Sequence, residues 1–282
     1  MAGTGPRRRE GIARNLMPFP HPHPDSFVVV TGASQGIGRA MATDFAKTGY
    51  NVLLIARRED VLRELAEDLS TGYRVKAEVY ACDLADPAAR RDLIAHLGTL
   101  RVAMLVNSAG IASFGPWMDQ DWDYETKQFE LNATAVFELT RAVLPQMIER
   151  GEGAICNVGS AAGNSPIPNN ATYVLTKAGV NLFTESLHYE LKGKGVHCTL
   201  LAPGPVREAV VPEEEQSIVD KVVPDFLWTT YESCSQDTIH AMRHNRRRVV
   251  PGPLGSAMNV ANQIIPTAVL SPLMGWFYKK MA

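Results

Sequence analysis

The sequence predicts a single doubly wound α/β domain, in which helices cover both faces of a seven-stranded parallel sheet. Short apolar segments rich in β-branched residues alternate with segments of helical period. This alternation is typical of a parallel sheet that is buried on both sides. A glycine-rich turn follows the first apolar segment directly, as it does in doubly wound domains.

The expected elements follow one another at regular spacing. Strands are predicted at Phe27–Thr31, Asn51–Ala56, Val75–Ala81, Ala103–Asn107, Ala154–Val158, Val196–Ala202 and Arg248–Val250. Helices are predicted at Gly36–Thr48, Glu59–Ser70, Asp86–Leu97, a long segment through Asn132 to Arg150, and Val174–Lys192. Within Glu59–Ser70, for example, Leu62, Leu65 and Leu69 share one face at helical period. Seven strands at this spacing form one domain rather than two.

Composition places the chain among ordinary soluble globular proteins. Hydrophobic residues make up 45% and charged residues 21% of the 282 positions, and the formal net charge is -2. This charge gives no electrostatic basis for binding nucleic acid, which favours a basic face. The four cysteines are scattered without a CxxC pair (Cys82, Cys156, Cys198 and Cys234). We therefore expect buried free thiols in a reducing cytoplasm, with a disulfide or a metal site as the lesser alternative.

Both ends of the chain differ from its centre. In residues 1–24 an arginine run is followed by alternating prolines rather than an apolar run of signal-peptide length. We assign 1–24 to an extension that is mobile or lies on the surface, 25–255 to the domain, and 256–282 to an apolar tail. No residue from Val249 to Tyr278 is charged, but Pro266 and Pro272 argue against a straight transmembrane helix. Packing on the domain or a partner subunit is preferred, with contact to a membrane surface and a membrane span as alternatives.

The glycine-rich turn has the spacing of a dinucleotide-binding site. Gly32 permits the tight turn, Gly36 lets the backbone approach phosphates, and Gly38 lets the helix pack closely on the strand. A glycine turn without a ligand is the alternative, which the position between a strand and a helix disfavours. The other residues of the turn that we expect beside the cofactor are Ser34, Gln35, Ile37 and Arg39.

The end of the second strand favours NADP(H) over NAD(H). An NAD-specific site would place a carboxylate there to bind the ribose hydroxyls, but this chain has Ala56 followed by Arg57 and Arg58. A guanidinium pairs with a phosphate, which a carboxylate would repel. Alternatively, the two arginines pair with the acidic residues that follow them. Asp83 and Leu84 are expected at the adenine end, unless Asp83 serves only as a helix N-cap.

A second constellation lies in the later half of the chain. Tyr173 and Lys177 are four residues apart, so they share a helical face, and Ser160 follows a predicted strand at the edge where ligands bind. Reduction of a carbonyl by hydride requires a proton donor for the nascent alkoxide. A lysine cation favours the phenolate of a nearby tyrosine, and we expect Lys177 and the oxidised nicotinamide together to lower the Tyr173 pKa. We predict that Tyr173 donates the proton and that Ser160 holds the carbonyl oxygen, with no metal involved. Amphipathic packing and a solvated charge are the structural alternatives.

These motifs together resemble the short-chain dehydrogenase/reductase family over about residues 25–255. Thr31–Gly38 matches the family's TGxxxGxG, and its NNAG appears as Asn107-Ser108-Ala109-Gly110. The resemblance implies a Rossmann-type oxidoreductase with Asn132, Ser160, Tyr173 and Lys177 as its catalytic set. It also implies that Lys177 binds the nicotinamide ribose and that Asn132 supports a water relay. The further cofactor contacts that it implies are Asn107, Ala109, Gly110, Pro203, Gly204 and Val206. A homodimer or homotetramer is expected from the resemblance alone.

Two departures from the family pattern stand out. Ser108 replaces the second asparagine of NNAG, which is a small polar exchange. Glu208 stands where the family often has a threonine that bonds the carboxamide. Either backbone groups near Val206 hold the carboxamide, or this loop is rebuilt.

We expect the segment from Arg207 to about Trp228 to be an apolar lid, which suits a hydrophobic substrate. The predicted function is therefore NADPH-dependent reduction of a ketone or aldehyde, such as a 3-oxoacyl or steroid-like substrate. Alternatives are an alcohol dehydrogenase working in the oxidative direction, a non-catalytic NADP(H) sensor, and a membrane-associated scaffold.

Overall fold

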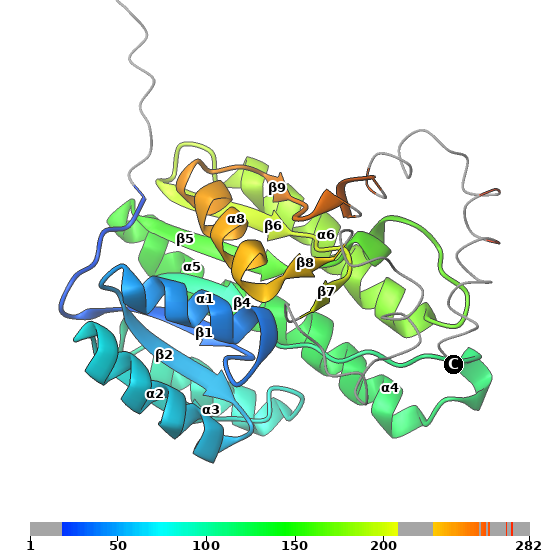
Figure 1. Cartoon of the computed structure of the whole chain (residues 1–282), viewed down its shortest axis with the longest axis horizontal. Coiled ribbons are helices and arrows are strands. Elements are labelled where there is room, and N and C mark those ends of the chain that lie inside the picture. The colour runs from blue at the N-terminus through cyan, green and yellow to red at the C-terminus, as the bar shows by residue number, and fades with distance from the viewer. Residues whose placement is uncertain are drawn as a thin grey trace, which may run out of the picture.

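The computed structural model describes residues 19–207, 228–253, 255–257, 259, 269 and 272. Its centre is a seven-stranded parallel sheet with the order β3-β2-β1-β4-β5-β6-β9 (Figure 1). The strands are β1 (Ser26–Thr31), β2 (Asn51–Ala56), β3 (Ala77–Ala81), β4 (Arg101–Asn107), β5 (Gly153–Val158), β6 (Val196–Leu201) and β9 (Arg248–Val249). The predicted doubly wound sheet is confirmed. A second, small sheet pairs β7 (Val206–Arg207) with β8 (Thr229–Thr230).

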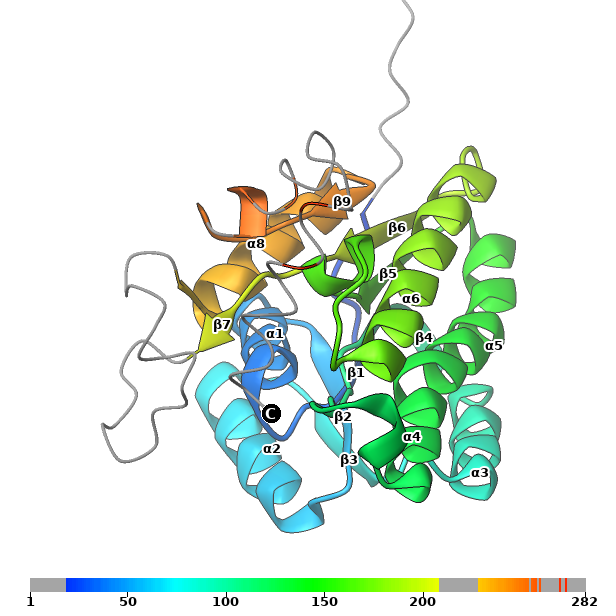
Figure 2. The same ribbon diagram turned by 90° about the vertical axis from the view of Figure 1, so that its right-hand side faces the viewer.

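Helices cover both faces of the sheet, and each layer encloses its own apolar core (Figure 2). One layer contains α1 (Gly36–Lys47), α2 (Glu59–Tyr73) and α8 (Tyr231–Arg243). The other contains α3 (Pro87–Leu97), α4 (Trp122–Phe129), α5 (Ala135–Arg150) and α6 (Ala171–Glu190). Apolar side chains on both faces of the strands explain why the strands read as continuous hydrophobic runs in the sequence. All four cysteines are buried and free.

The strand order reverses between β1 and β4, which are hydrogen-bonded neighbours in the sheet. From β1 the chain proceeds outward to β2 and β3, and it then returns to the opposite side of β1 to form β4. In doubly wound sheets, ligands bind outside the carboxyl ends of the strands at such a switch point. The fold therefore brings the glycine turn after β1 and the loop after β4 to one crevice.

The long predicted helix through Asn132 is interrupted by a different helical geometry. Between α4 and α5, residues Glu130–Thr134 form a π-helical segment, so Asn132 lies in a widened turn rather than in a regular α-helix. Such segments are frequent at functional sites. The other element ends agree with the predicted ranges within three residues; β9, for example, ends at Val249 and α6 begins at Ala171.

Part of the N-terminal extension lies against the domain. The Tyr50 hydroxyl donates a hydrogen bond to the Pro20 carbonyl at 2.6 Å, and Phe19 packs against the core formed with α1, α2 and α8. The Asn51 side chain donates to the carbonyls of His23 and Pro24 at 3.3 and 3.0 Å. Residues 19–24 therefore lie against the surface of the domain.

Several predictions fall outside the described residues. These include Glu208, the body of the expected lid at 208–227, and most of the apolar tail. Within the described ranges, no helix has the length and apolar content that a membrane crossing requires.

Candidate active site

The glycine turn has the tight geometry that close approach of a dinucleotide requires. Gly32 and Gly36 have φ angles of +67° and +59°, which favour glycine. A Cβ atom at Gly32 would lie 2.9 Å from the backbone of Ala109, and one at Gly38 would lie 2.4 Å from the Gly32 carbonyl oxygen. Thr31 joins the two loops, because its Oγ1 accepts hydrogen bonds from the N–H groups of Ser108 and Ala109. The turn is thus packed against the loop after β4 without room for side chains.

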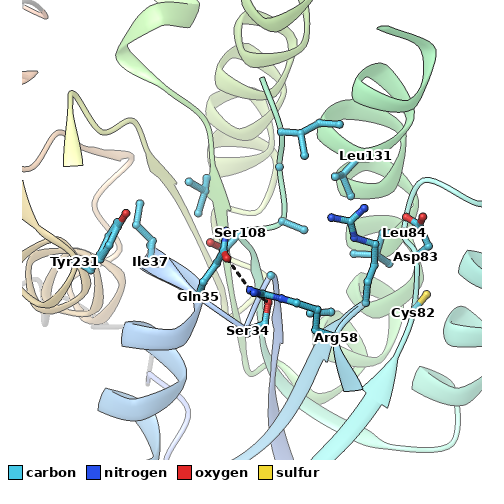
Figure 3. Close-up of a pocket in the computed structure, with 18 residues that line it drawn as sticks. Ser34, Gln35, Ile37, Arg58, Cys82, Asp83, Leu84, Ser108, Leu131 and Tyr231 are labelled. Atoms are coloured by element: carbon cyan, nitrogen blue, oxygen red, sulfur yellow. Dashed lines mark hydrogen bonds between the residues drawn. The ribbon is translucent and has the colours of Figure 1, made fainter. Parts of the chain in front are cut away.

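A cavity of about 470 Å³ opens beside this turn (Figure 3). Its lining includes eleven of the residues that the sequence placed at the cofactor: Gly32, Ser34, Gln35, Gly36, Ile37, Arg57, Arg58, Asp83, Leu84, Ala109 and Gly110. They come from the carboxyl ends of β1, β2, β3 and β4. The glycines leave space beside the backbone that side chains would fill, and Arg57 and Arg58 place positive charge at one end of the cavity. Such a site fits a dinucleotide, which carries phosphates.

Arg58 reaches across from β2 to the glycine turn. Its Nη2 donates hydrogen bonds to Ser34 Oγ at 3.0 Å and to Gln35 Oε1 at 2.6 Å, as Figure 3 shows. The alternative, in which both arginines pair with the acidic residues that follow them, does not hold for Arg58. Glu59 instead forms its ion pair with Arg63 one turn further along α2. The structure therefore brings a guanidinium to the cavity wall beside the turn.

Asp83 lines the cavity and forms an ion pair with Lys127 at 3.0 Å. Burial would raise the pKa of Asp83, but its hydrogen bonds with Lys127 and with the Ala85 N–H outweigh burial and lower the pKa below the ordinary value. The N-cap of α3 is Asp86, whose side chain accepts from the Ala88 N–H. The alternative of Asp83 as the N-cap is therefore wrong.

Other expected cofactor residues lie elsewhere. Arg39 is exposed on α1 and does not line the cavity. Asn107 is buried, and it donates to Thr140 Oγ1 at 3.2 Å and to Asn157 Oδ1 at 2.9 Å, so it joins β4 to α5 and β5. Pro203 accepts a hydrogen bond from the Ala161 N–H at 2.9 Å, which fixes its loop beside Ser160. Gly204 follows it, and Val206 lies in β7 paired with β8.

The four residues of the expected catalytic set gather around the carboxyl end of β5 and the start of α6. Ser160 follows β5 and forms a side-chain hydrogen bond with Tyr173. The Lys177 Nζ lies 5.7 Å from the centre of the Tyr173 ring and donates a 2.8 Å hydrogen bond to the Val158 carbonyl. A Cβ atom at Gly110 would lie 3.2 Å from Asn132 Oδ1 and 3.5 Å from Lys177 Nζ, so the cavity loop and this cluster adjoin.

The Asn132 side chain ties the π-helical turn to the cavity loop. Its Oδ1 accepts from the Ile111 N–H at 3.0 Å, and its Nδ2 donates to the Ile111 carbonyl at 2.8 Å. Nδ2 also donates to Thr176 Oγ1 at 3.3 Å, on the residue next to Lys177. The amide thus holds the loop after β4 against the helix that carries the tyrosine and the lysine.

Protein groups alone shift the two ionisable side chains in opposite directions. Burial raises the pKa of Tyr173 above its ordinary value of 10.0, and the hydrogen bond with Ser160 offsets only part of this rise. Burial lowers the pKa of Lys177 from 10.5 to about 8. In the protein alone, desolvation is the largest influence on the Tyr173 pKa. The lowering expected from Lys177 together with the oxidised nicotinamide stays a prediction.

Some residues that line the cavity were not predicted from the sequence. Tyr231, the first residue of α8, faces the glycine turn, and a Cβ at Gly36 would lie 3.6 Å from its ring. Cys82, Ile111, Leu131 and Val158 also line the cavity. Leu131 adjoins the expected Asn132, and Cys82 precedes Asp83, so proximity to predicted residues could have indicated both. Tyr231 lies beyond the expected lid, and no local pattern could have placed it there.

A glycine turn at the switch point, next to buried Ser160 and Lys177 and half-buried Tyr173, defines the class of nicotinamide-dependent oxidoreductases that act on alcohol or carbonyl groups. Comparison with known proteins then gives the family. The family model "short chain dehydrogenase" matches residues 26–218. The chain belongs to the short-chain dehydrogenase/reductase family.

Relatives with differing substrates occur among the similar proteins. The chain is 42% identical to sulfoacetaldehyde reductase 2 of Chromohalobacter salexigens, over 63% of this chain and 71% of that protein. It is 37% identical to a very-long-chain 3-oxoacyl-CoA reductase of Bos taurus, over 60% of this chain and 56% of that enzyme. The chain thus spans little more than half the length of this bovine relative. The solved structure of a short-chain dehydrogenase from Sphingobium yanoikuyae in complex with NADPH superimposes with a TM-score of 0.73 at 29% identity, covering 84% of this chain and 94% of that one.

Proposed function

We propose that this chain is an NADPH-dependent reductase that converts a ketone or aldehyde of a hydrophobic substrate to the alcohol. The observation that carries the proposal is the juxtaposition of two sites. The cluster of Ser160, Tyr173 and Lys177 lies next to the cavity, because Gly110 lies beside Lys177 and also lines the cavity. Arg58 lines the far wall of the same cavity, where it is hydrogen-bonded to Gln35. The nicotinamide supplies the hydride to the carbonyl carbon when it is bound.

Side chains of the protein supply the proton that the carbonyl oxygen receives. Tyr173 gives its hydroxyl proton to the carbonyl oxygen, and its raised pKa means that it carries this proton at neutral pH. Ser160 donates a hydrogen bond to the same oxygen. Lys177 lies on the same face of α6, and its pKa of about 8 lets it lose and regain a proton near neutral pH. Lys177 can therefore return a proton toward Tyr173 after each reduction.

NADPH rather than NADH is the proposed cofactor because of the cations at the cavity. Arg57 and Arg58 both line it, and Arg58 is oriented by Ser34 and Gln35 toward the glycine turn. A ribose 2′-phosphate there would receive charge-assisted hydrogen bonds. The structurally similar Sphingobium protein in complex with NADPH supports the same choice.

A hydrophobic carbonyl substrate, such as a 3-oxoacyl thioester, is supported by the very-long-chain 3-oxoacyl-CoA reductases among the relatives. The apolar residues of the sequence between Arg207 and Trp228 agree with this class. The sulfoacetaldehyde reductase relative makes a small anionic aldehyde the second candidate. We further propose a cytoplasmic homo-oligomer that pairs through the exposed apolar side chains of α5 and α6, among them Phe137, Leu175 and Leu182.

The test is NADPH oxidation by the purified protein. Substrates are 3-oxoacyl thioesters of increasing chain length, steroid ketones and sulfoacetaldehyde, with NADH in parallel. Turnover that rises with chain length and needs NADPH supports the proposal, whereas turnover of sulfoacetaldehyde alone supports the second candidate. Tyr173→Phe should abolish turnover and retain NADPH binding. A wild-type protein that binds NADPH but reduces no carbonyl would instead be a sensor.

The cofactor preference has a separate test in Arg58→Ala. Loss of a hydrogen bond to a charged group costs about 1.5–3 kcal/mol, so the NADPH dissociation constant should rise roughly 10- to 100-fold. The NADH dissociation constant should stay within a factor of two. Arg63→Ala is the matched control, since Arg63 is on the same helix and pairs only with Glu59 among the described residues. Equal losses for both dinucleotides would refute the 2′-phosphate role.

A further inference from the structure

The backbone of Ser160 is held by one side chain of the helix that carries Tyr173 and Lys177. Asn181 Oδ1 accepts from the Ser160 N–H at 3.3 Å, and Asn181 Nδ2 donates to the Ser160 carbonyl at 2.9 Å. Asn181 is one turn beyond Lys177 on α6 and is 1% exposed. The Ser160 hydroxyl also accepts from the Ala162 N–H, and the Ser160 carbonyl from the Gly163 N–H, each at 3.1 Å. Asn181 is thus the side chain that links both backbone groups of Ser160 to α6.

Asn181 is held in turn by Asn164. Asn181 Nδ2 donates to Asn164 Oδ1 at 3.1 Å, at the end of the short 3-10 helix η3 (Ala161–Asn164) that follows Ser160. The same oxygen accepts from Arg248 Nη2 at 3.3 Å. Among the residues that the structure describes, the buried Asn164 Nδ2 has no hydrogen-bond partner, and the contacts of this side chain are made by its oxygen.

Arg248 connects this serine loop to two further parts of the chain. It lies on β9, the last strand of the sheet, and its Nε is 2.9 Å from Glu185 Oε1 on α6. Its Nη1 donates to Asn259 Oδ1 at 3.0 Å, at the start of the C-terminal segment. The guanidinium thus joins the serine loop and the C-terminal segment by hydrogen bonds and the helix by an ion pair that lacks hydrogen-bond geometry, and its planar fork serves such multiple contacts better than a lysine would.

The neighbouring Arg247 offers a natural comparison. Its Nε lies 3.4 Å from the same Glu185 oxygen, and its Nη1 donates to the Tyr189 hydroxyl at 3.1 Å. Its contacts lie on the outer part of α6, away from Asn164. The two arginines share an ion-pair partner and differ in their connection to the serine loop.

We propose that Arg248 is a positioning residue for the reduction, which fixes the Ser160 hydroxyl against Tyr173 through Asn164 and Asn181, and that Asn259 steadies it from the C-terminal segment. The proposal rests on the function proposed above. No family motif identified in the sequence includes Arg248, Asn164 or Asn259. The step itself is unchanged: Tyr173 gives the proton, and Arg248 decides how well the serine is aligned for it.

Kinetics of Arg248→Met and Arg247→Met give the first test. Displacement of a catalytic group by about 1 Å can lower a rate up to about 100-fold, so we expect kcat to fall about 10-fold or more in Arg248→Met. The NADPH dissociation constant and KM should stay within a factor of two, and Arg247→Met should leave kcat within a factor of two. Melting temperatures of both variants separate misalignment from unfolding. Equal kcat values for the two variants would overturn the proposal.

A second pair of variants tests the path through Asn164. Asn164→Asp retains the accepting oxygen and removes the unpartnered amide nitrogen, so it should keep at least half of the wild-type kcat. Asn164→Leu removes the acceptor and should match Arg248→Met. Asn259→Ala should lower kcat by a smaller factor, about 2- to 5-fold. If Asn164→Leu retains full kcat, Arg248 does not act through this residue.

A measurement without turnover separates this proposal from the proposed function. The Tyr173 hydroxyl is titrated by NMR of ¹³C-labelled tyrosine, with Tyr173→Phe to assign its signal. The groups that face it are the Ser160 hydroxyl and the Lys177 ammonium. Because the Ser160 hydrogen bond lowers the Tyr173 pKa, Arg248→Met should raise that pKa and Arg247→Met should not. A wild-type protein without activity would refute the function, whereas an unchanged Tyr173 titration in Arg248→Met would refute the positioning.

Discussion

Lys177→Met should stabilise this protein at neutral pH while removing its catalytic activity. Lys177 is 5% exposed, and burial lowers its pKa from 10.5 to about 8. Since one pKa unit corresponds to 1.36 kcal/mol, keeping the ammonium charged in the folded state costs about 3 kcal/mol. The variant also loses the hydrogen bond from Nζ to the Val158 carbonyl, worth about 1 kcal/mol. The expected net gain in the free energy of unfolding at pH 7 is about 2 kcal/mol.

The pH dependence follows from the direction of this shift. At pH 7 both the folded and the unfolded chain carry the proton on Lys177, so the full cost is present. Between about pH 8 and pH 10.5 the folded protein releases the proton first, the unfolded chain binds more protons, and the contribution of Lys177 to stability rises with pH. Above this range the cost is gone. The advantage of the variant should therefore shrink from pH 8 upward and reverse at about pH 10, where the remaining cost of the ammonium equals the lost hydrogen bond.

Urea unfolding of wild type and variant at pH 7, 8, 9 and 10 measures this difference directly. Other groups titrate over the same range, but they do so in both proteins and cancel in the comparison. Lys192→Met is the control, because Lys192 is an exposed residue just beyond the end of α6. The free energy of unfolding of Lys192→Met should depend on pH in the same way as that of the wild-type protein. If Lys177→Met is no more stable than wild type at pH 7, or if the two curves run parallel, the ammonium is not destabilised by burial.

Four further substitutions test the site and the fold around it. Gly38→Ala should abolish dinucleotide binding and destabilise the fold by about 1–3 kcal/mol, because the added Cβ would lie 2.4 Å from a backbone oxygen. Gly72→Ala, with nothing within 4 Å of its Cβ, should by contrast stabilise the fold by about 0.5–1 kcal/mol in thermal unfolding. Arg90→Met should destabilise by about 3–5 kcal/mol in urea, because the fully buried guanidinium pairs with two glutamates, Glu130 at 2.6 Å and Glu138 at 2.8 Å; a loss below 1 kcal/mol would contradict this. Ser160→Ala should shift the acidic limb of the oxidative pH–rate profile to higher pH, because the lost hydrogen bond raises the Tyr173 pKa; an unshifted limb would show that Ser160 does not act on Tyr173.

Much of the fold could be predicted because its signals are local. The strand Asn51–Ala56 has the predicted bounds, since a continuous apolar run in a two-sided sheet leaves no other placement. The glycine turn was equally predictable, because positive φ angles at Gly32 and Gly36 and the close contact at Gly38 require the absence of a side chain. The grouping of Tyr173 with Lys177 needed only helical spacing.

Predictions of individual contacts were less successful where several elements meet. The cofactor contact expected for Asn107 stays a prediction, and the structure adds hydrogen bonds from its amide to Thr140 and Asn157 that the sequence did not indicate. Asn132 was expected in a regular helix and lies in a π-helical turn, where its amide binds both backbone groups of Ile111. In the protein alone, burial raises the pKa of Tyr173 more than the Ser160 hydrogen bond lowers it, so the lowering expected from Lys177 together with the oxidised nicotinamide stays a prediction.

The sequence by itself determined the doubly wound sheet, the position of the dinucleotide turn and the reaction class, because each depends on patterns within about ten residues of chain. Only the tertiary structure decided which arginine faces the turn, how Tyr231 comes to the cavity, and that Arg248 holds Asn164 across 84 positions. Such contacts depend on how crossover connections return the chain to the sheet. The sequence of β9, at the edge of the sheet, does not indicate that Arg248 contacts the loop after Ser160.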